Sequence, residues 1–293
     1  MKPSDFIHPE DAAAMRQLES IPGFAAFAKK LMSIGTEQQL YGVNMASSIR
    51  LSEKQLPHIY KHLPPICQRL GIAEPEFYLQ MSPIPNAWTM GDTRIYITVT
   101  SALLEMMNDE ELDATLAHEC GHILCRHSLY HTLVYWIRNG LVEQGLMPKK
   151  MMTPVEIALM YWNRKSELSA DRAACIITSP EAVVSTMARF AGGPKSITSQ
   201  INYQEWAKQG DEYEKIQQSG LWNKALQLQA IAELSHPFAA VRVREVMKWS
   251  ESEQYRMIKK GLLQLEAPDG FCPQCGNAIE KEWKFCLNCG HQL

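Results

Sequence analysis

The chain has 293 residues, and its 46% hydrophobic and 21% charged residues are typical of a globular protein with a sizeable core. The formal net charge of -3 favours neither a nucleic-acid partner nor an acidic membrane surface. No uncharged stretch reaches the roughly 20 apolar residues of a membrane span, and the N-terminal MKPSDFIHPED lacks the apolar core of a signal peptide. These features predict a soluble, cytoplasmic protein that neither enters a membrane nor binds nucleic acid.

The first part of the chain is predicted to be helical, and a strand follows it. Residues 1–70 are expected to form a helical region packed on the domain that comes next. Residues 94–100, RIYITVT, alternate between two faces, with Ile95, Ile97 and Val99 on one of them. This period of two, together with the β-branched side chains, predicts a strand.

Capping residues then indicate a series of helices. Asn108 is expected to cap a helix with an acidic first turn. The run Thr153-Pro154-Val155-Glu156 combines a capping box with a proline at the first helical position, which predicts a helix from Thr153 to about residue 178. Another helix is predicted from Ser179-Pro180 to 192–194, and two more near 221–234 and 238–264.

The helix predicted after Asn108 contains the run His118-Glu119-Cys120-Gly121-His122. His118 and His122 are four residues apart, so both imidazoles leave the same side of the helix and can bind one zinc ion. Glu119 is close enough to handle a proton of a water on that metal. Gly121 costs a helix roughly 1 kcal/mol relative to alanine, so we expect another element to pack closely there. The alternative is a helix whose two histidines have only structural hydrogen bonds.

A catalytic zinc also needs a third protein ligand and a position for water. Glu167 and Asp171 are four residues apart, which puts two carboxylates on one face of the helix predicted from Thr153. One carboxylate can bind the metal while the other accepts a hydrogen bond from a ligand imidazole. The alternative is a solvated acidic face near Arg164 and Lys165.

This ordered series of motifs resembles the M48 group of zincin metallopeptidases, which includes the HtpX-type and Ste24-type enzymes. The resemblance covers roughly residues 71–250, and the series is far more specific than any single motif. It is carried by the residues His118-Glu119-x-x-His122, Glu167-x-x-x-Asp171, the segment 86–91, the strand at 95–100, Ser101-Ala102-Leu103-Leu104, Ser235-His236-Pro237 and Arg242.

The resemblance implies a role for each residue of the motifs. His118, His122 and Glu167 would be the zinc ligands, and Glu119 would be the general base. Asp171 would orient His118. Many members of this group carry transmembrane helices, and this sequence shows none. A membrane-embedded substrate therefore does not follow from the resemblance.

Three other histidines have weaker assignments. His236, before Pro237 at a predicted helix start, resembles the downstream histidine of the family. By that resemblance it would stabilise the tetrahedral oxyanion or occupy the fourth metal position at rest, and an ordinary histidine at a helix start is an equal alternative. His127 and His131 are expected toward the apolar face of the motif helix, where a structural role or a hydrogen bond to a metal ligand is favoured.

A peptide substrate is expected to lie along the strand before the motif helix, because an exposed strand edge can pair with an extended chain. The segment that begins at Asn86 would border the same cleft. The predicted substrate-binding residues are Asn86, Ala87, Trp88, Ile95, Tyr96, Ile97 and Arg242.

The C-terminal tail contains two Cys-x-x-Cys pairs, each followed by a glycine. Cys272, Cys275, Cys286 and Cys289 are predicted to form a zinc ribbon with a closed tetrahedral site for a structural zinc. The tail is too short to hold a core, so we expect it to need the metal to fold. A thioredoxin-like redox role is less favoured. The balanced charges of the tail argue against nucleic acid. A protein is a candidate partner of the ribbon.

We therefore expect an α+β fold. A mostly helical, gluzincin-like zincin domain with a small antiparallel sheet is predicted at 71–266, after a helical region at 1–70 and before a zinc ribbon at 271–293. The expected function is that of a zinc endopeptidase with one catalytic and one structural zinc ion. It would cleave peptides or unfolded proteins in protein quality control. The alternative is a zinc-containing chaperone or adaptor that binds extended segments without cleaving them.

Overall fold

The computed structural model describes residues 1–31, 37–138, 149–218 and 238–266, with single positions and short pairs in the C-terminal tail. The chain forms two compact units, Met1–Ser250 and Glu251–Leu293. The first unit holds the residues predicted to bind the catalytic metal. The second holds α15 (Glu253–Glu266) and the cysteine-rich tail.

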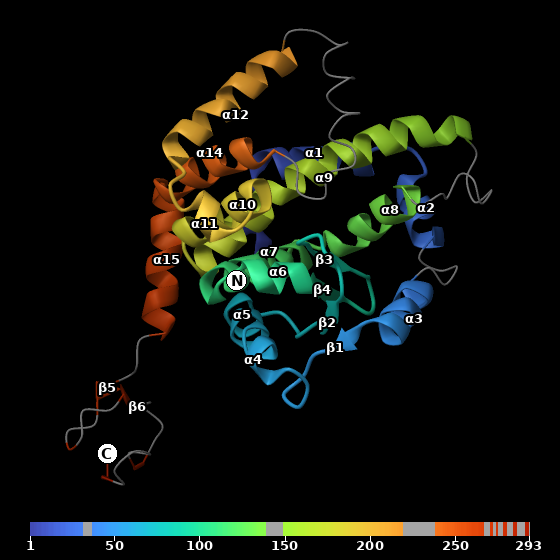
Figure 1. Cartoon of the computed structure of the whole chain (residues 1–293). Helices are drawn as coiled ribbons and strands as arrows, with labels where there is room; N and C mark the ends of the chain where they lie inside the picture. The colour runs from blue at the N-terminus through green and yellow to red at the C-terminus, as the bar shows by residue number, and fades with distance from the viewer. Residues whose placement is uncertain are drawn as a thin grey trace. The chain divides into compact units, whose positions relative to one another are not determined.

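The first unit is mostly helical (Figure 1). A short 3₁₀ helix, Pro3–Asp5, opens the chain. The α-helices described in this unit are α1 (Pro9–Glu19), α2 (Phe24–Leu31), α3 (Glu37–Ser47), α4 (Pro57–Tyr60), α5 (Leu63–Leu70), α6 (Ser101–Met106), α7 (Asp109–Leu124), α8 (Ser128–Arg138), α9 (Lys149–Ile177), α10 (Pro180–Gly192), α11 (Lys195–Thr198), α12 (Tyr203–Gln218) and α14 (Ala239–Ser250).

Four strands form one small sheet. They are β1 (Ile49–Arg50), β2 (Glu76–Gln80), β3 (Ala87–Met90) and β4 (Tyr96–Thr100), and their order across the sheet is β1-β2-β4-β3. The fold class is as expected, with one correction. The sheet is mixed and not antiparallel, because β2 and β4 run parallel while β1–β2 and β3–β4 are antiparallel pairs.

The internal position of β4 corrects the expected peptide-binding edge. β4 has β2 on one side and β3 on the other, and all of its residues are buried. Its backbone groups therefore pair within the sheet, and the strand offers no edge to a substrate. The alternating sequence correctly indicated a strand, but alternation does not reveal which neighbours a strand will have. In the described part of the sheet, β3 is an edge strand, with β4 on one side only, and it contacts α7.

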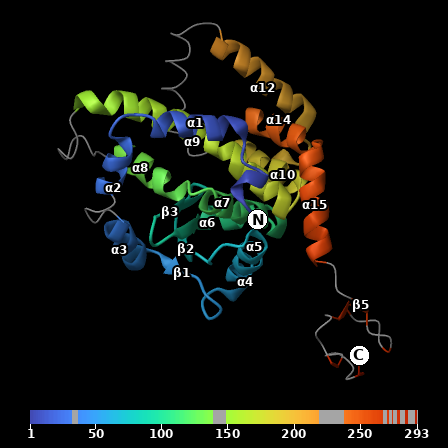
Figure 2. The ribbon, with the colours of Figure 1, turned by 180° about the vertical axis from the view of Figure 1, so that it is seen from behind.

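The core of the unit is built around the long helix α9. Helix α7 packs along α9, and α1 packs on another side of α9. Figures 1 and 2 show this arrangement from opposite directions. Gly121 of α7 lies at the closest approach. A Cβ atom added there would be 2.8 Å from the Cβ of Ala173 and 3.1 Å from the Cα of Ala170. The expectation that this glycine permits close packing is confirmed.

Two predicted helix starts are confirmed by side-chain caps. The Asn108 side chain accepts a hydrogen bond from the backbone N–H of Glu111, and the Glu111 side chain accepts one from the Asn108 N–H. Ser179 Oγ accepts from Ala182 N–H at the start of α10. These caps depend only on residues within one turn, which is why the sequence predicts them well.

Other boundaries differ from the prediction. Helix α9 begins at Lys149, so Thr153-Pro154 lies inside its first turns and does not start it. The residues before this pair, Lys-Lys-Met-Met, are strong helix formers and extend the helix backward. The helix expected over 238–264 is two helices, α14 and α15, because Ser252 Oγ accepts from Tyr255 N–H and caps a new start. The helix expected at 221–234 lies outside the described residues.

The tail unit shows a short antiparallel pair, β5 (Gly270–Phe271) with β6 (Ala278–Ile279), and an isolated bridge between Phe285 and Gln292. The four tail cysteines lie outside the described residues. Through the described part of the whole chain, no helix has the length and apolar character that crossing a bilayer requires.

Candidate metal centre and active site

Three buried side chains from two helices meet at the α7–α9 contact. His118 and His122 come from successive turns of α7, and Glu167 comes from α9. Their exposed fractions are 6%, 1% and 3%. The two Nε2 atoms are 3.1 Å apart, and the Glu167 carboxylate oxygens lie 3.5 Å from His118 Nε2 and 3.3 Å from His122 Nε2. The structure thus brings the three predicted metal ligands together.

These separations fit a tetrahedral zinc site. Zinc–nitrogen and zinc–oxygen bonds of about 2.0–2.1 Å place any two ligand atoms of a tetrahedron roughly 3.3–3.4 Å apart. The two Nε2 atoms are separated by 3.1 Å, and each of them lies at a similar distance, 3.5 or 3.3 Å, from a different oxygen of Glu167. Two imidazoles and one carboxylate are also the donor set of many catalytic zinc sites, in which the fourth position serves water or substrate.

A carboxylate fixes the orientation of His118. Its Nδ1 lies 2.9 Å from Oδ1 of Asp171, one helical turn beyond Glu167. Because a carboxylate can only accept, we assign the proton to Nδ1, which leaves the lone pair of Nε2 directed toward the metal position. Asp171 therefore lies where the resemblance places it.

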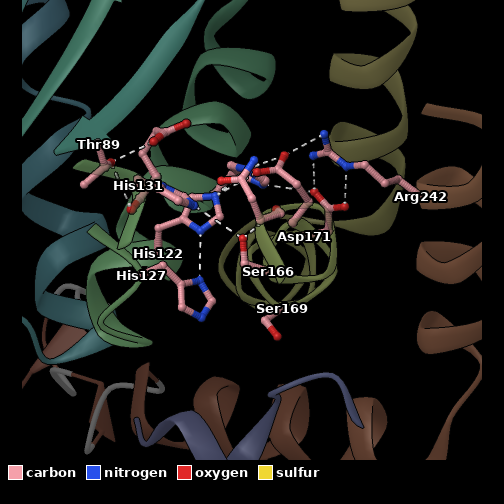
Figure 3. Close-up of polar contacts among 12 residues, drawn as sticks. Thr89, His122, His127, His131, Ser166, Ser169, Asp171 and Arg242 are labelled. Atoms are coloured by element: carbon pink, nitrogen blue, oxygen red, sulfur yellow. Dashed lines mark hydrogen bonds and ion pairs between the residues drawn. The ribbon is translucent and has the colours of Figure 1, made fainter. Parts of the chain in front are cut away.

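Arg242 of α14 holds the two carboxylates of α9 that lie at the site. Its Nε and Nη2 donate to Asp171 at 2.8 and 2.6 Å, and its Nη1 lies 2.9 Å from Glu167 (Figure 3). Burial acts to raise the pKa of Asp171, but Arg242 and His118 outweigh burial and hold the pKa below its usual value. Arg242 was predicted to contact substrate; its guanidinium lies buried against these acids, and a contact with substrate stays a prediction.

The pKa values of the two candidate metal-binding imidazoles are shifted in opposite directions. Burial acts to lower the pKa of His118, but hydrogen bonds and charges of Asp171 and Glu167 outweigh it and raise the pKa to about 10. Burial lowers the pKa of His122 to about 4, and the neighbouring His118 acts in the same direction. A cation at this position therefore replaces a proton near His118, while His122 is already neutral.

Glu119 lies beside the three candidate metal ligands, and a residue of β3 holds its carboxylate. Its Oε2 accepts a hydrogen bond of 2.7 Å from the hydroxyl of Thr89, and the side chain is 1% exposed. This contact ties the predicted base to the strand at the sheet edge. Thr89 was not among the predicted site residues. The segment 86–91 was singled out, but no pattern in it indicates a partner 30 residues further on.

The motif helix ends earlier than expected, and this changes the position of the next two histidines. Helix α7 stops at Leu124, and Arg126 adopts a left-handed conformation with φ of 60°. The resulting turn brings His127 back so that its Nδ1 lies 3.0 Å from Nδ1 of His122 (Figure 3). His131 lies on α8, where its ring packs against that of His122 at 4.4 Å between centroids.

A cleft of about 490 Å³ opens beside the metal centre. Glu119, His122 and Glu167 line it on one side. Of the predicted substrate-binding residues, the structure brings Asn86, Ala87, Trp88 and Tyr96 to this cleft. Ile95 and Ile97 are not part of the lining, and Ile97 is fully buried because β4 is internal. His236 lies outside the described residues.

The fold and the site together define a zincin-type metallopeptidase domain, and the comparison with known families agrees. Residues 52–250 match the model of peptidase family M48, and residues 271–293 match a zinc-ribbon domain. This chain therefore belongs to peptidase family M48 and carries a C-terminal zinc ribbon.

Several proteins are similar to this chain. The plastoglobule-localized metallopeptidase 48 of Arabidopsis thaliana chloroplasts is 34% identical over 87% of this chain and 75% of its own length. A protease HtpX homolog of Pelotomaculum thermopropionicum is 34% identical over 31% of this chain and 33% of its own length. One of Tropheryma whipplei is 23% identical over 54% of this chain and 64% of its own length. The chain thus spans less than two thirds of these HtpX homologs.

Proposed function

We propose that this protein is a zinc-dependent endopeptidase in which His118, His122 and Glu167 hold the metal and Glu119 is the general base. The observation that carries the proposal is the position of the Glu119 carboxylate, which borders the same cleft as two of the three metal-binding side chains. When bound, zinc would polarise the peptide carbonyl and lower the pKa of water toward about 7.

Each neighbouring side chain then has a defined task. Thr89 donates to Oε2 of Glu119 and leaves Oε1 to take the proton of the attacking water. The same oxygen can deliver this proton to the leaving amine. Asp171 keeps His118 in the tautomer that presents Nε2, and Arg242 holds Asp171 and Glu167 in place. The burial of these groups keeps bulk water away from the hydrogen bonds that orient them.

The cleft suits an extended, partly apolar peptide. It runs past β3, an edge strand of the described sheet, and is lined by apolar groups such as Leu40, Val134 and Tyr135. Asn86 Oδ1 is buried and has no hydrogen-bond partner among the described residues. A buried amide oxygen without a partner is costly, and the N–H of a bound peptide would satisfy it. We take unfolded or flexible protein segments as the substrate class, which is consistent with a role in protein quality control.

The tail completes the proposal. We assign a structural zinc to Cys272, Cys275, Cys286 and Cys289, in addition to the catalytic zinc. The match to a zinc-ribbon domain supports this assignment. We propose that the ribbon binds a protein partner or substrate. The cytoplasmic location also remains a proposal, since the name of the Arabidopsis relative places that protein at the plastoglobule.

The non-proteolytic alternative is a chaperone or adaptor that uses the cleft only to bind. The two functions differ in the need for Glu119, because a binding site does not require a proton acceptor beside the metal.

A digest of casein or a peptide library tests the proposal directly. We expect the zinc-loaded protein to cleave, and Glu119→Gln to lose more than about 10²-fold in kcat, in line with the usual contribution of general acid–base catalysis. Glu119→Gln should keep its zinc. Glu110→Gln is the matched control, since it makes the same change in the exposed first turn of the same helix. Peptide binding without cleavage by the wild-type protein would favour the chaperone.

A further inference from the structure

The second metal-binding histidine, His122, is oriented through a chain of contacts that ends in the N-terminal helix. His122 Nδ1 lies 3.0 Å from His127 Nδ1, and His127 Nε2 lies 3.2 Å from Oδ2 of Asp11 on α1. The three side chains are 1%, 1% and 0% exposed. No solvent therefore competes for these hydrogen bonds.

The positions of the protons in this series of hydrogen bonds follow from the carboxylate of Asp11 at its end. A carboxylate only accepts, so Nε2 of His127 must carry the proton that it donates to Asp11. When His127 carries only this proton, Nδ1 has a lone pair, which can only accept from Nδ1–H of His122. His122 is thereby left with its lone pair on Nε2, the atom that faces His118 and Glu167. The opposite arrangement of protons would place a hydrogen on Nε2 and block metal binding.

Asp11 is itself held firmly in position. Its carboxylate accepts from Trp162 Nε1 at 3.1 Å and from Ser169 Oγ at 2.5 Å, and both residues belong to α9. Ser169 Oγ in turn accepts from the backbone N–H of His8 at 2.9 Å. Burial acts to raise the pKa of Asp11, but His127 and Ser169 outweigh burial and lower the pKa, which keeps Asp11 a carboxylate.

We propose that Asp11 and His127 are positioning residues for the metal centre, which fix the tautomer of His122 as Asp171 fixes that of His118. Asp11 lies outside residues 52–250, the part of the chain that matches the peptidase family model. The N-terminal helix would thus supply one of the two acids that orient the metal-binding histidines. This inference rests on the zinc site of the proposed function.

The test is the zinc affinity of the full-length protein, measured by competition with a chelator at a temperature where circular dichroism shows every variant folded. Asp11→Asn keeps the size of the side chain but allows the amide to donate to His127, which favours the wrong tautomer. We expect its affinity at this site to fall roughly 10- to 100-fold, the usual effect of losing a partner of a metal-binding histidine. Ser169→Ala is the matched control, because it removes one hydrogen bond of Asp11 and leaves the contact with His127.

A second pair of variants separates positioning from general stability. In His127→Asn the amide oxygen can replace Nδ1 as the acceptor for His122, without help from Asp11. This variant should bind zinc more tightly than His127→Phe, and adding Asp11→Asn to it should cause no further loss. Equal losses in Asp11→Asn and Ser169→Ala, or a full further loss in the double variant, would overturn the proposal. Glu167→Gln serves as the reference, and if it leaves the zinc affinity unchanged, the zinc site itself is wrong.

Discussion

Glu167 and Asp171 are chemically similar acids one turn apart, and their neighbours give them different tasks. Glu167 faces both imidazoles, while Asp171 faces the far side of His118 and the guanidinium of Arg242. The distinction depends on single contacts of about 3 Å. Substitutions that keep the shape of each side chain can therefore separate ligand from support.

We expect Glu167→Gln to lose more zinc affinity than Asp171→Asn. The first change weakens a bond to the metal itself, whereas the second keeps an acceptor for His118 and should cost roughly 10- to 100-fold. Metal titration against a chelator measures both. Asp113→Asn, on α7 but paired with His62 at 2.7 Å, should bind zinc like the wild type. A weaker site in Asp171→Asn than in Glu167→Gln would exchange the two roles.

Zinc binding should release a proton from His118. The pKa of this ring in the metal-free protein is raised from 6.5 to about 10, so at pH 7 the metal displaces about one proton. Lowering the pH by one unit should therefore weaken the apparent affinity about tenfold. Conversely, the stability that the protonated ring gives the metal-free protein is present below pH 6.5 and lost as the pH rises through about 10.

Calorimetry in buffers of different ionisation enthalpy measures the released protons directly, after the tail site has been filled with zinc. An affinity for the second zinc that stays constant between about pH 6 and 8 would contradict the assignment of the proton to His118.

At the scale of secondary structure, the spacing of α7 and α9 sets the size of the metal centre. Gly121→Ala should gain roughly 1 kcal/mol in helix propensity but lose about 1–3 kcal/mol to overpacking against Ala173 and Ala170. The variant should bind zinc less tightly, because a wider spacing moves Glu167 away from the imidazoles. Gly42→Ala in α3 meets open space and should be stabilising. Chemical denaturation and zinc titration compare the two variants.

The elements also show what the sequence can and cannot predict. The caps at Asn108 and Ser179, and the helical spacing of the metal ligands, depend on residues within one or two turns, and all were predicted. The neighbours of β4 depend on pairing with segments that nothing in its own sequence specifies. The turn at Arg126 was missed for a related reason, since a left-handed arginine is unfavourable locally and is maintained by the surrounding packing.

The candidate site divides in the same way. The clustering of His118, His122 and Glu167 was predicted because the motif spacing of a helix is regular. Their roles as ligands, and that of Glu119 as base, stay predictions. Asp11 and Thr89 were missed because each reaches the site from a distant part of the chain. Asp11 lies 116 residues before its partner His127, and Thr89 lies 30 residues before its partner Glu119.

At the scale of the whole molecule, the two proposed zinc sites should be separable. The intact chain should hold two zinc ions, and a chain ending at Ala267 should hold one, because the three catalytic ligands lie within residues 1–250 and all four tail cysteines are removed. The shortened protein should still cleave small peptides. Elemental analysis and peptide digests of both proteins provide the measurement. One zinc in each protein would remove the ribbon assignment, and loss of peptide cleavage would make the tail part of the active site.

The position of Arg242 has a consequence for the synthesis of the protein. The ribosome synthesises a chain from its N-terminus. Glu167 and Asp171 of α9 therefore emerge before Arg242, the arginine that pairs with them. Until α14 has emerged and packed, Glu167 and Asp171 lack the guanidinium that holds both of them in the folded protein. The set of side chains that forms the candidate metal centre is therefore complete only after α14 has been synthesised and packed.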